Sequence, residues 1–196
     1  MKKEDLILIG AGGHADACAD LVNSTKKFNI RAIVGTKKDF NKIVLKNLKV
    51  KYSDKDLNSL SKKYKNALIS VGQIRDYQTR LRIFKKLKKL NFNLPKIVSP
   101  FAVISKSSEI GEGTIIMPGV VIGANVHIGK NCIINSKSLV EHGSTINDNT
   151  HIATSVTING ETNIGANSFV GSNSTISQGT IIKKNSFIKM CSRIVK

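Results

Sequence analysis

The segment IIMPGVVIGANVHIGKNCII, residues 115–134, places an isoleucine at every sixth position. The same spacing continues through the C-terminal half of the chain without a change of phase, always as isoleucine or valine. These positions are Val98, Ile104, Ile110, Ile116, Ile122, Ile128, Ile134, Val140, Ile146, Ile152, Ile158, Ile164, Val170, Ile176, Ile182, Ile188 and Ile194. A helix repeats every 3.6 residues and a strand every two, so neither explains a period of six.

A six-residue period is typical of a parallel β-helix, in which short strands alternate with turns and each isoleucine or valine points inward. With roughly three hexads per coil, the segment is long enough for roughly five to six coils and a continuous core. From Ile104 onward, a small or β-branched residue lies two positions before each isoleucine or valine, as at Thr114 and Ser138. Residues that directly follow, such as Gly111, Gly123 and Asn135, are expected to take the left-handed backbone conformation at the corners.

The first half of the chain has a different pattern. DLILIG, IRAIVG and NALISVG are apolar runs typical of buried strands, AGGHADACADLV follows the first as a helix, and residues 75–91 form a basic amphipathic helix. Alternating strands and helices predict a small Rossmann-like α/β domain with a parallel sheet. The proline-containing segment 92–100 marks the junction, so we expect an α/β domain over residues 1–95 and a β-helix over residues 96–196.

A glycine turn joins the first strand to the first helix. Gly10, Gly12 and Gly13 lie in the sequence GAGGHA, where backbone N–H groups and the helix N-terminus are able to bind a phosphate. His14 is a candidate contact for the same phosphate or a capping residue. The pattern departs from GxGxxG and no acid follows about 20 residues later, so an NAD site is not predicted. A tight turn without a ligand remains an alternative.

Gly72 follows the strand ALISV and begins a second candidate edge of the same pocket. Arg75 and Arg80 come shortly after it, and the carboxyl ends of strands collect ligand contacts in open α/β sheets. The alternative for Arg80 is an ion pair with Asp76, four residues earlier on the helix.

The formal net charge of +18 raises the question of a nucleic-acid partner. Residues 1–95 contain 22 Lys and Arg against 8 Asp and Glu, whereas residues 96–196 contain 9 against 5. Much of the excess is lysine on helix surfaces, Trp is absent and aromatic residues are few, so nucleic acid is not the favoured partner.

The three cysteines have no paired spacing, which disfavours disulfides and a thiolate metal site. The N-terminus has charged residues where a signal peptide would be apolar, and no apolar run reaches the length of a membrane span. We therefore expect a soluble, cytoplasmic protein without membrane insertion.

Taken together, the two halves resemble bacterial sugar acyltransferases of the sialic-acid O-acetyltransferase type, and most closely the UDP-4-amino-sugar N-acetyltransferases. The resemblance covers nearly the whole chain. It rests on LIGAGGHA, VGQIRDYQTR, IIMPGVVIGANVHIG, NSKSLVEHG and HIATSVTINGETNIGANSFVG.

The resemblance implies a left-handed β-helix, a homotrimer, a nucleotide sugar bound by the α/β domain, and acetyl-CoA bound between subunits without a metal. It assigns the catalytic base to His142, the oxyanion-binding N–H to Gly160, and the histidine near the acetyl-CoA thioester to His151. The chemistry suits these residues, because a neutral imidazole accepts a proton near pH 7 and glycine leaves its N–H unobstructed.

Two features depart from the family pattern. The acid that usually follows the catalytic histidine is replaced by Gly143, which leaves Glu141 or another subunit as the source of an orienting carboxylate. The chain also ends at CSRIVK, without the usual tail that covers CoA, so a smaller CoA site is expected.

Several other functions stay open. An O-acetyltransferase acting on a sialic-acid-like sugar would use the same base, since His142 is able to activate a hydroxyl as well as an amine. A metal-dependent hydratase would use histidines of adjacent subunits, but His127, His142 and His151 occupy different phases of the repeat. A non-catalytic trimeric scaffold that binds nucleic acid through the basic first half is the remaining alternative.

Overall fold

A computed structural model describes residues 3–44 and 48–195 and divides the chain into two compact units. The first unit comprises residues 1–72 and 79–95, and the second comprises residues 73–78 and 96–196. The second unit thus begins at Lys96 after the junction, and it also includes the short segment Gln73–Gln78, which precedes it in the chain.

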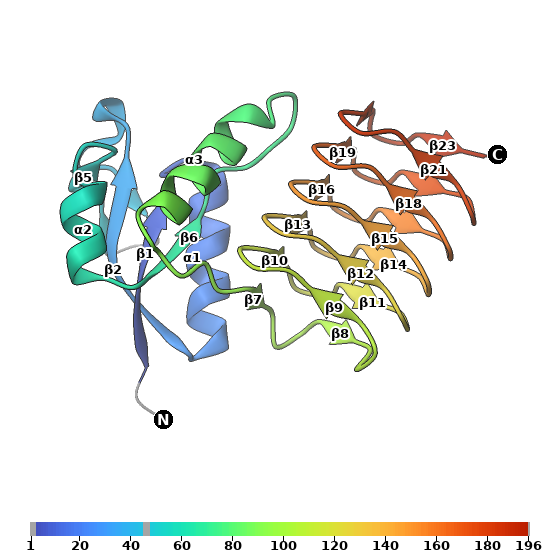
Figure 1. Ribbon diagram of the computed structural model, residues 1–196, viewed down its shortest axis with the longest axis horizontal. Coiled ribbons are helices and arrows are strands. Elements are labelled where there is room, and N and C mark those ends of the chain that lie inside the picture. Colours follow the sequence, from blue (N-terminus) through green and yellow to red (C-terminus); the bar gives the residue numbers. More distant parts are fainter. Residues whose placement is uncertain (1–2, 45–47, 196) are drawn as a thin grey trace. The chain divides into compact units, whose positions relative to one another are not determined.

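The first unit is an α/β domain built on a four-stranded parallel sheet (Figure 1). The strands lie in the order β5-β2-β1-β6, so β1 pairs with both β2 and β6. The described elements are β1 (Glu4–Ile9), α1 (Gly13–Thr25), β2 (Phe28–Gly35), the 3-10 helix η1 (Lys37–Asp39), β3 (Ile43–Val44), β4 (Leu48–Lys49), β5 (Tyr52–Ser53), α2 (Leu57–Lys63), β6 (Asn66–Ile69) and α3 (Gln78–Lys89).

Alternation along β1 divides the core of this unit between the two faces of the sheet. Ile7 and Ile9 belong to one cluster with Leu57 and Leu60 of α2 and Leu87 of α3. Successive strand residues point to opposite faces, so Leu6 and Leu8 face the other side, and Figure 1 shows helices on both sides of the sheet. The basic helix that the sequence predicts over residues 75–91 is confirmed as α3, with shorter bounds.

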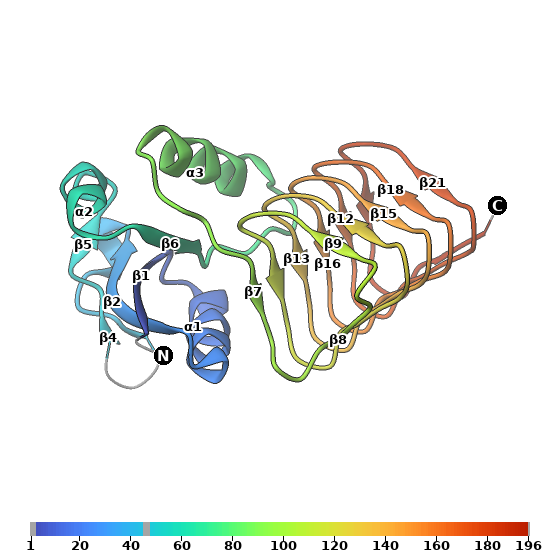
Figure 2. The same ribbon diagram turned by 60° about the horizontal axis from the view of Figure 1, so that its bottom comes forward.

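The second unit is a left-handed parallel β-helix (Figure 2). The hexad period predicts the parallel β-helix, and the family resemblance implies its left hand. Its strands have two residues each, and each ends on the isoleucine or valine of a hexad. They are β7 (Ile97–Val98), β8 (Val103–Ile104), β9 (Glu109–Ile110), β10 (Ile115–Ile116), β11 (Val121–Ile122), β12 (His127–Ile128), β13 (Ile133–Ile134), β14 (Leu139–Val140), β15 (Thr145–Ile146), β16 (His151–Ile152), β17 (Thr157–Ile158), β18 (Asn163–Ile164), β19 (Phe169–Val170), β20 (Thr175–Ile176), β21 (Ile181–Ile182), β22 (Phe187–Ile188) and β23 (Arg193–Ile194).

Three sheets form the faces of this β-helix. We call them sheet 1 (β7, β10, β13, β16, β19, β22), sheet 2 (β8, β11, β14, β17, β20, β23) and sheet 3 (β9, β12, β15, β18, β21). The chain visits the sheets in that order, so stacked residues are 18 apart, as Ile116 and Ile134 are. The turn between sheets 2 and 3 is therefore the corner opposite sheet 1.

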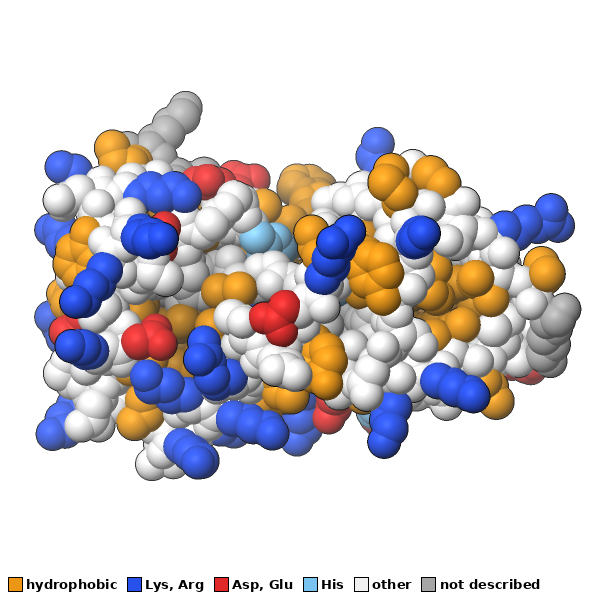
Figure 3. Space-filling model, turned by 90° about the horizontal axis from the view of Figure 1, so that it is seen from above, with side chains coloured by type: hydrophobic (Ala, Val, Ile, Leu, Met, Phe, Trp, Pro, Cys, Tyr) orange, Lys and Arg blue, Asp and Glu red, His pale blue; other side chains and the backbone are white. Residues whose placement is uncertain are grey.

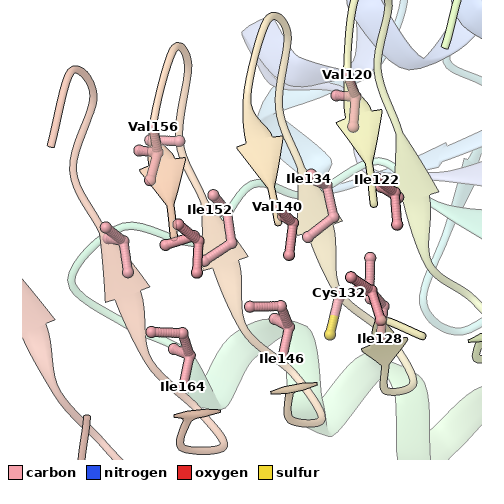
Figure 4. Close-up of a cluster of buried hydrophobic side chains, with 14 of the residues drawn as sticks. Val120, Ile122, Ile128, Cys132, Ile134, Val140, Ile146, Ile152, Val156 and Ile164 are labelled. Carbon is pink, nitrogen blue, oxygen red and sulfur yellow. The ribbon is translucent and has the colours of Figure 1, made fainter. Parts of the chain in front are cut away.

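The interior combines an apolar column with a row of buried hydroxyl groups. Ile122, Ile128 and Ile134 point inward together with residues from successive coils (Figure 4). The small residues two positions earlier connect neighbouring coils. Thr114 is one example, since its hydroxyl donates to the Gly129 carbonyl at 2.8 Å and accepts from the Cys132 N–H at 2.9 Å. A hydroxyl that donates to one backbone carbonyl and accepts from one backbone N–H satisfies both groups, which explains why many of these buried positions are serine or threonine.

The prediction that the residues directly after each hexad isoleucine or valine take the left-handed conformation is wrong. The left-handed residues lie two positions further on, at every sixth residue from Gly113 through Asn125 and Gly143 to Cys191. Gly111 and Gly165 are needed for a different reason, which is the close approach of the next coil. A Cβ at Gly165 would lie 2.4 Å from the backbone N of Lys184.

Asparagines at one set of these left-handed corners form a hydrogen-bonded column. Asn131 donates to Asn149 at 2.7 Å, Asn149 to Asn167 at 3.0 Å, and Asn167 to Asn185 at 3.0 Å, in each case from side-chain amide to side-chain carbonyl. Asparagine tolerates positive φ better than most residues, and its amide serves as both donor and acceptor. The column therefore stabilises four successive coils at this corner.

Candidate active site

The imidazole of His142 lies against Gly160, which is one coil further along the β-helix. Both residues belong to turns between sheets 2 and 3, after β14 and β17 respectively. The Glu161 N–H donates to the His142 carbonyl at 2.9 Å, which keeps the two turns in register. A Cβ at Gly160 would lie 2.6 Å from Cε1 and 2.7 Å from Nε2 of His142. Only glycine leaves room for the ring in this position.

At this corner an exposed base lies over a buried backbone donor. His142 is exposed, and among the described residues no group hydrogen-bonds to its ring nitrogens. The Gly160 N–H likewise has no acceptor within the described part of the chain. The N–H next to the ring thus lacks the acceptor that a substrate oxygen would supply, and the exposed ring is available for a substrate proton.

The carboxylates near this corner do not contact the His142 ring within one chain. Glu141 is half-buried, and the described residues contain no hydrogen bond or ion pair that links it to His142. Gly143 takes one of the left-handed corner positions, with φ +65°. Glu161 follows one coil later, and its Cγ would lie 3.5 Å from a Cβ at Gly143. Glu161 is therefore an acid near His142 that the sequence did not single out.

His151 lies on a different side of the β-helix from His142. It is in β16 on sheet 1, whereas His142 is at the corner opposite that sheet. Its ring is buried, packs edge-on against Phe169 with centroids 5.2 Å apart, and hydrogen-bonds through Nδ1 to the Gln73 carbonyl. Within one chain the structure does not bring His151 together with His142 and Gly160.

In the α/β unit, a cavity of about 530 Å³ opens at the carboxyl ends of β1 and β2. Gly10 and Gly12 line it, while Gly13, His14, Gly72 and Arg75 do not. His14 is in the first turn of α1 and approaches Gly72, where a Cβ would lie 3.8 Å from the Cβ of His14. The glycine turn, His14 and Gly72 are therefore neighbours.

The three glycines of the turn differ in what the fold requires of them. Gly10 has φ +120°, and a Cβ there would lie 2.6 Å from a methyl group of Val71. Gly12 and Gly13 have no positive φ, and a Cβ at either would meet no described atom within 4 Å. No side chain caps α1 at Gly12, so the first N–H groups of the helix are accessible to an anion. Gly12 and Gly13 are thus free to serve a ligand rather than the fold.

The charged residues of the cavity include several that the sequence did not single out. Lys37, Lys55 and Arg82 supply positive charge. Hydrogen bonds from the Thr36 hydroxyl and the Thr36 N–H lower the pKa of Asp39, which favours the ionised form of this carboxylate at the edge of the cavity. Lys37 follows the predicted strand IRAIVG, so the tendency of ligands to bind at the carboxyl ends of strands would have identified it. Arg82 comes from a distant helix and has no local signal.

Arg80 has a structural position. Its side chain is fully buried, and Nη1 donates to the carbonyls of Ile69 and Val71, each at 2.8 Å. It joins α3 to the end of β6. Arg75 is exposed and lies in the segment Gln73–Gln78, which belongs to the β-helix unit.

The alternatives of metal and nucleic-acid binding gain no support from the described residues. No group of three or more His, Cys, Asp or Glu among them is arranged to hold a metal ion. The Nδ1 of His127 lies instead 3.4 Å from Oε2 of Glu109 on sheet 3. On the face shown in Figure 3, Lys and Arg side chains are scattered among neutral and acidic ones. None of the described helices has the length and apolar character that a membrane crossing needs.

Family models match both units of the chain. Residues 107–142 match the bacterial transferase hexapeptide model of six repeats, and residues 161–190 match the hexapeptide repeat of succinyl-transferase. These matches define the class, which is that of hexapeptide-repeat transferases. Residues 5–87 match the PglD N-terminal domain. The chain therefore carries a PglD-type N-terminal domain followed by hexapeptide repeats of the kind found in bacterial transferases.

Solved structures share this fold along nearly the whole chain. PerB from Caulobacter crescentus, in complex with CoA and GDP-perosamine, has 24% identity and a TM-score of 0.90 over 98% of this chain and 89% of its own. The acetyltransferase domain of PglB from Neisseria gonorrhoeae FA1090, in complex with acetyl coenzyme A, has 25% identity and a TM-score of 0.87 over 98% and 93%. WeeI from Acinetobacter baumannii AYE has 21% identity and a TM-score of 0.66 over 97% and 94%. No curated protein matches the chain.

Proposed function

We propose that this protein is an acetyl-CoA-dependent N-acetyltransferase that modifies the amino group of a nucleotide-linked amino sugar. The observation that carries the proposal is the pairing of the exposed His142 ring with the Gly160 N–H, which has no acceptor among the described residues. A base and an oxyanion donor side by side are what acyl transfer to an amine requires. PerB, which shares the fold, is described in complex with CoA and GDP-perosamine.

The proposed reaction needs no covalent enzyme intermediate. The sugar amine attacks the thioester carbonyl carbon, the Gly160 N–H hydrogen-bonds to the oxygen as it gains negative charge, and His142 accepts the proton that the amine loses. When the tetrahedral centre collapses, the C–S bond breaks and the CoA thiolate leaves and takes up a proton. The pKa of a thiol is near 8.5, which makes the thiolate a good leaving group.

The α/β unit offers the nucleotide-sugar site. Gly12 and Gly13 allow the backbone and the N-terminus of α1 to approach a diphosphate, and Lys37, Lys55 and Arg82 supply positive charge around the cavity. His14 and Gly72 lie beside this turn and Arg75 belongs to the segment that follows, so we include all three among the substrate-binding residues. The ionised Asp39 is an acceptor for N–H groups of the base or for ribose hydroxyls.

We further propose that the active form is a homotrimer. His142 is on the corner opposite sheet 1, and His151 is on sheet 1 itself. Residues on opposite sides of one β-helix approach each other only when a second chain packs alongside. Acetyl-CoA between subunits would then contact residues of both, with Glu141 or a partner acid beside His142. Both proposed substrates are cytoplasmic metabolites, so we assign the enzyme to the cytoplasm.

The test is release of thiol from acetyl-CoA by the purified protein with UDP-, dTDP- and GDP-linked 4-amino sugars. The control acceptors are the corresponding 4-hydroxy nucleotide sugars and sialic acid. We expect thiol release with an amino sugar and none with its 4-hydroxy counterpart. Release only with sialic acid would assign the protein as an O-acetyltransferase. Silence across the whole panel from intact trimers would contradict the proposed function.

A further inference from the structure

The His142 ring needs a group that fixes its orientation. The ring is exposed, and among the described residues no group hydrogen-bonds to its nitrogens. A neutral imidazole that acts as a base through one nitrogen carries its proton on the other. When that second N–H donates to a carboxylate, the ring is held in place and the imidazolium formed by proton transfer is stabilised. A carboxylate beside this ring would therefore improve the base.

A carboxylate is available one coil further along the same corner. Asn125, Gly143, Glu161 and Gly179 succeed one another there at intervals of 18 residues, and all four take the left-handed conformation, with φ of +56°, +65°, +58° and +65°. Glu161 thus lies between two glycines. Because neither glycine has a side chain, no neighbour in this column occupies the space on either side of the Glu161 side chain.

The Glu161 side chain inclines toward the coil that contains His142. Its Cγ is 3.5 Å from the point where a Cβ on Gly143 would lie, whereas its Cα is 3.9 Å from that point. Gly143 directly follows His142, so the stem of Glu161 covers the backbone next to the base. The Glu161 N–H also donates to the His142 carbonyl at 2.9 Å, which holds the two residues in register.

The ring of His142 lies over the residue that precedes Glu161. That residue is Gly160, where a Cβ would lie 2.7 Å from Nε2 and 3.1 Å from Nδ1 of the ring. The imidazole and the stem of Glu161 are therefore neighbours at one corner. Glu161 is exposed, and the described residues contain no hydrogen bond or ion pair of its carboxylate, so no described group competes for it.

We propose that Glu161 is the positioning residue of the base. Its side chain rotates toward the ring, and the carboxylate accepts a hydrogen bond from one ring N–H while the other nitrogen accepts the proton that the sugar amine loses. No proton passes to the carboxylate, which stabilises the positive charge on the ring. Glu161 thus joins Glu141 and a partner acid as a source of this carboxylate. The inference rests on the proposed function for the reaction that His142 serves.

Glu161→Gln removes the charge and keeps the size of the side chain. It should lower kcat by about 10-fold or more, the effect of one hydrogen bond to a charged group. KM for both substrates should be nearly unchanged, because the imidazolium exists only once the proton has been transferred. Glu109→Gln, the same change at an exposed residue of β9, is the control and should leave kcat unchanged.

Glu141→Gln is the competing variant. A loss of kcat in Glu141→Gln together with wild-type kcat in Glu161→Gln would assign the role to Glu141 and overturn the proposal. Wild-type kcat in both variants would overturn it as well.

A carboxylate restored from the other side of the contact tests the role of the charge directly. Gly143→Asp in the Glu161→Gln background places an acid on the coil of His142. Aspartate tolerates positive φ, and Asn125 shows that a residue with a side chain adopts this conformation in the same column. This double variant should recover much of the lost kcat. Gly143→Asn in the same background has the same shape without the charge and should recover none, so equal kcat in the two double variants would overturn the proposal.

The contact is also measurable without turnover. In alkaline solution, where imidazole is neutral, a carboxylate acceptor favours the ring tautomer that donates to it. The nitrogen NMR resonances of His142, assigned by their loss in His142→Ala, should therefore move toward those of free imidazole in Glu161→Gln. Unchanged resonances would overturn the proposal. If the wild-type protein transfers acetyl to no acceptor, the proposed function fails, while this comparison still decides whether Glu161 holds the ring.

Discussion

The ring of His142 occupies the space that a side chain at Gly160 would fill, since a Cβ on Gly160 would lie 2.6 Å from Cε1 of His142. The base and the proposed oxyanion donor are therefore coupled sterically. Gly160→Ala should displace the imidazole and lower kcat by about 100-fold, the cost of a misplacement of about 1 Å. Thermal unfolding should change little, because Gly160 has no positive φ and the exposed ring is able to move. The control is Gly160→Ala in a His142→Ala background, where the added methyl group should have no further effect on turnover.

Removal of the imidazole itself tests its role as the base. His142→Ala should lower kcat by about 100-fold or more, a typical contribution of general-base catalysis, with KM for both substrates nearly unchanged. The side chain is exposed and makes no described hydrogen bond, so the oligomeric state and the melting temperature should be preserved. Steady-state kinetics with size-exclusion chromatography would measure both. Wild-type turnover in this variant would exclude His142 from the mechanism.

The glycine turn allows the same substitution to be compared at two kinds of site. Gly12→Ala or Gly13→Ala should leave the melting temperature of the free protein within a few degrees of wild type, because an added Cβ meets no described atom within 4 Å. Either change should weaken nucleotide-sugar binding, which calorimetric titration would detect. Gly10→Ala should instead destabilise the fold by about 1–3 kcal/mol, because its φ is +120° and its Cβ would collide with Val71. Equal effects at all three glycines would contradict this division.

The buried hydroxyl of Thr114 should contribute measurably to the stability of the β-helix. Thr114→Val keeps the shape of the side chain but leaves the Gly129 carbonyl and the Cys132 N–H without their partner. We expect a loss of about 1–3 kcal/mol in the free energy of unfolding by urea. Thr145→Val, on the outer side of sheet 3, is the control and should change stability by less than about 0.5 kcal/mol.

The cysteines should differ in reactivity and in their effect on alkaline stability. Cys191 is exposed, while Cys18 and Cys132 are buried. A thiol reagent should therefore modify one cysteine in the folded protein and three after denaturation. Desolvation by burial, opposed in part by the charge of Arg80, raises the pKa of Cys18 to about 12 from 9.0.

This shift also determines the sign of the pH dependence. The unfolded chain releases the Cys18 proton above pH 9.0 and the folded chain holds it to about pH 12. The stability that this group contributes is thus present below pH 9.0 and is lost as the pH rises through that interval. The free energy of unfolding of wild type and of Cys18→Ala, measured from pH 8 to 10, should fall less steeply with pH in the variant.

Much of the fold and part of the site were predictable from local patterns. The strict hexad period determines a β-helix, because each Ile or Val must reach the same interior at an interval of six residues. The same period relates His142 to Gly160, which are three hexads apart, so the register stacks them. The glycine turn after β1 likewise follows from a strand, a short turn and a helix that are adjacent in sequence.

Other features depend on contacts between distant residues. The attachment of Gln73 to His151 joins positions 78 residues apart, and neither residue has a local pattern that identifies the other. Arg82 reaches the cavity of the glycine turn from α3, about 70 residues later in the chain. The sequence predicts left-handed corners two residues too early. Composition shows which residue types tolerate a positive φ, but it does not show which position of the turn requires one. The sequence by itself thus determined the periodic architecture and the residue types of the base and the donor. Only the tertiary structure decided which face His151 occupies and what it holds, because side-chain packing between distant segments is not encoded in any local period.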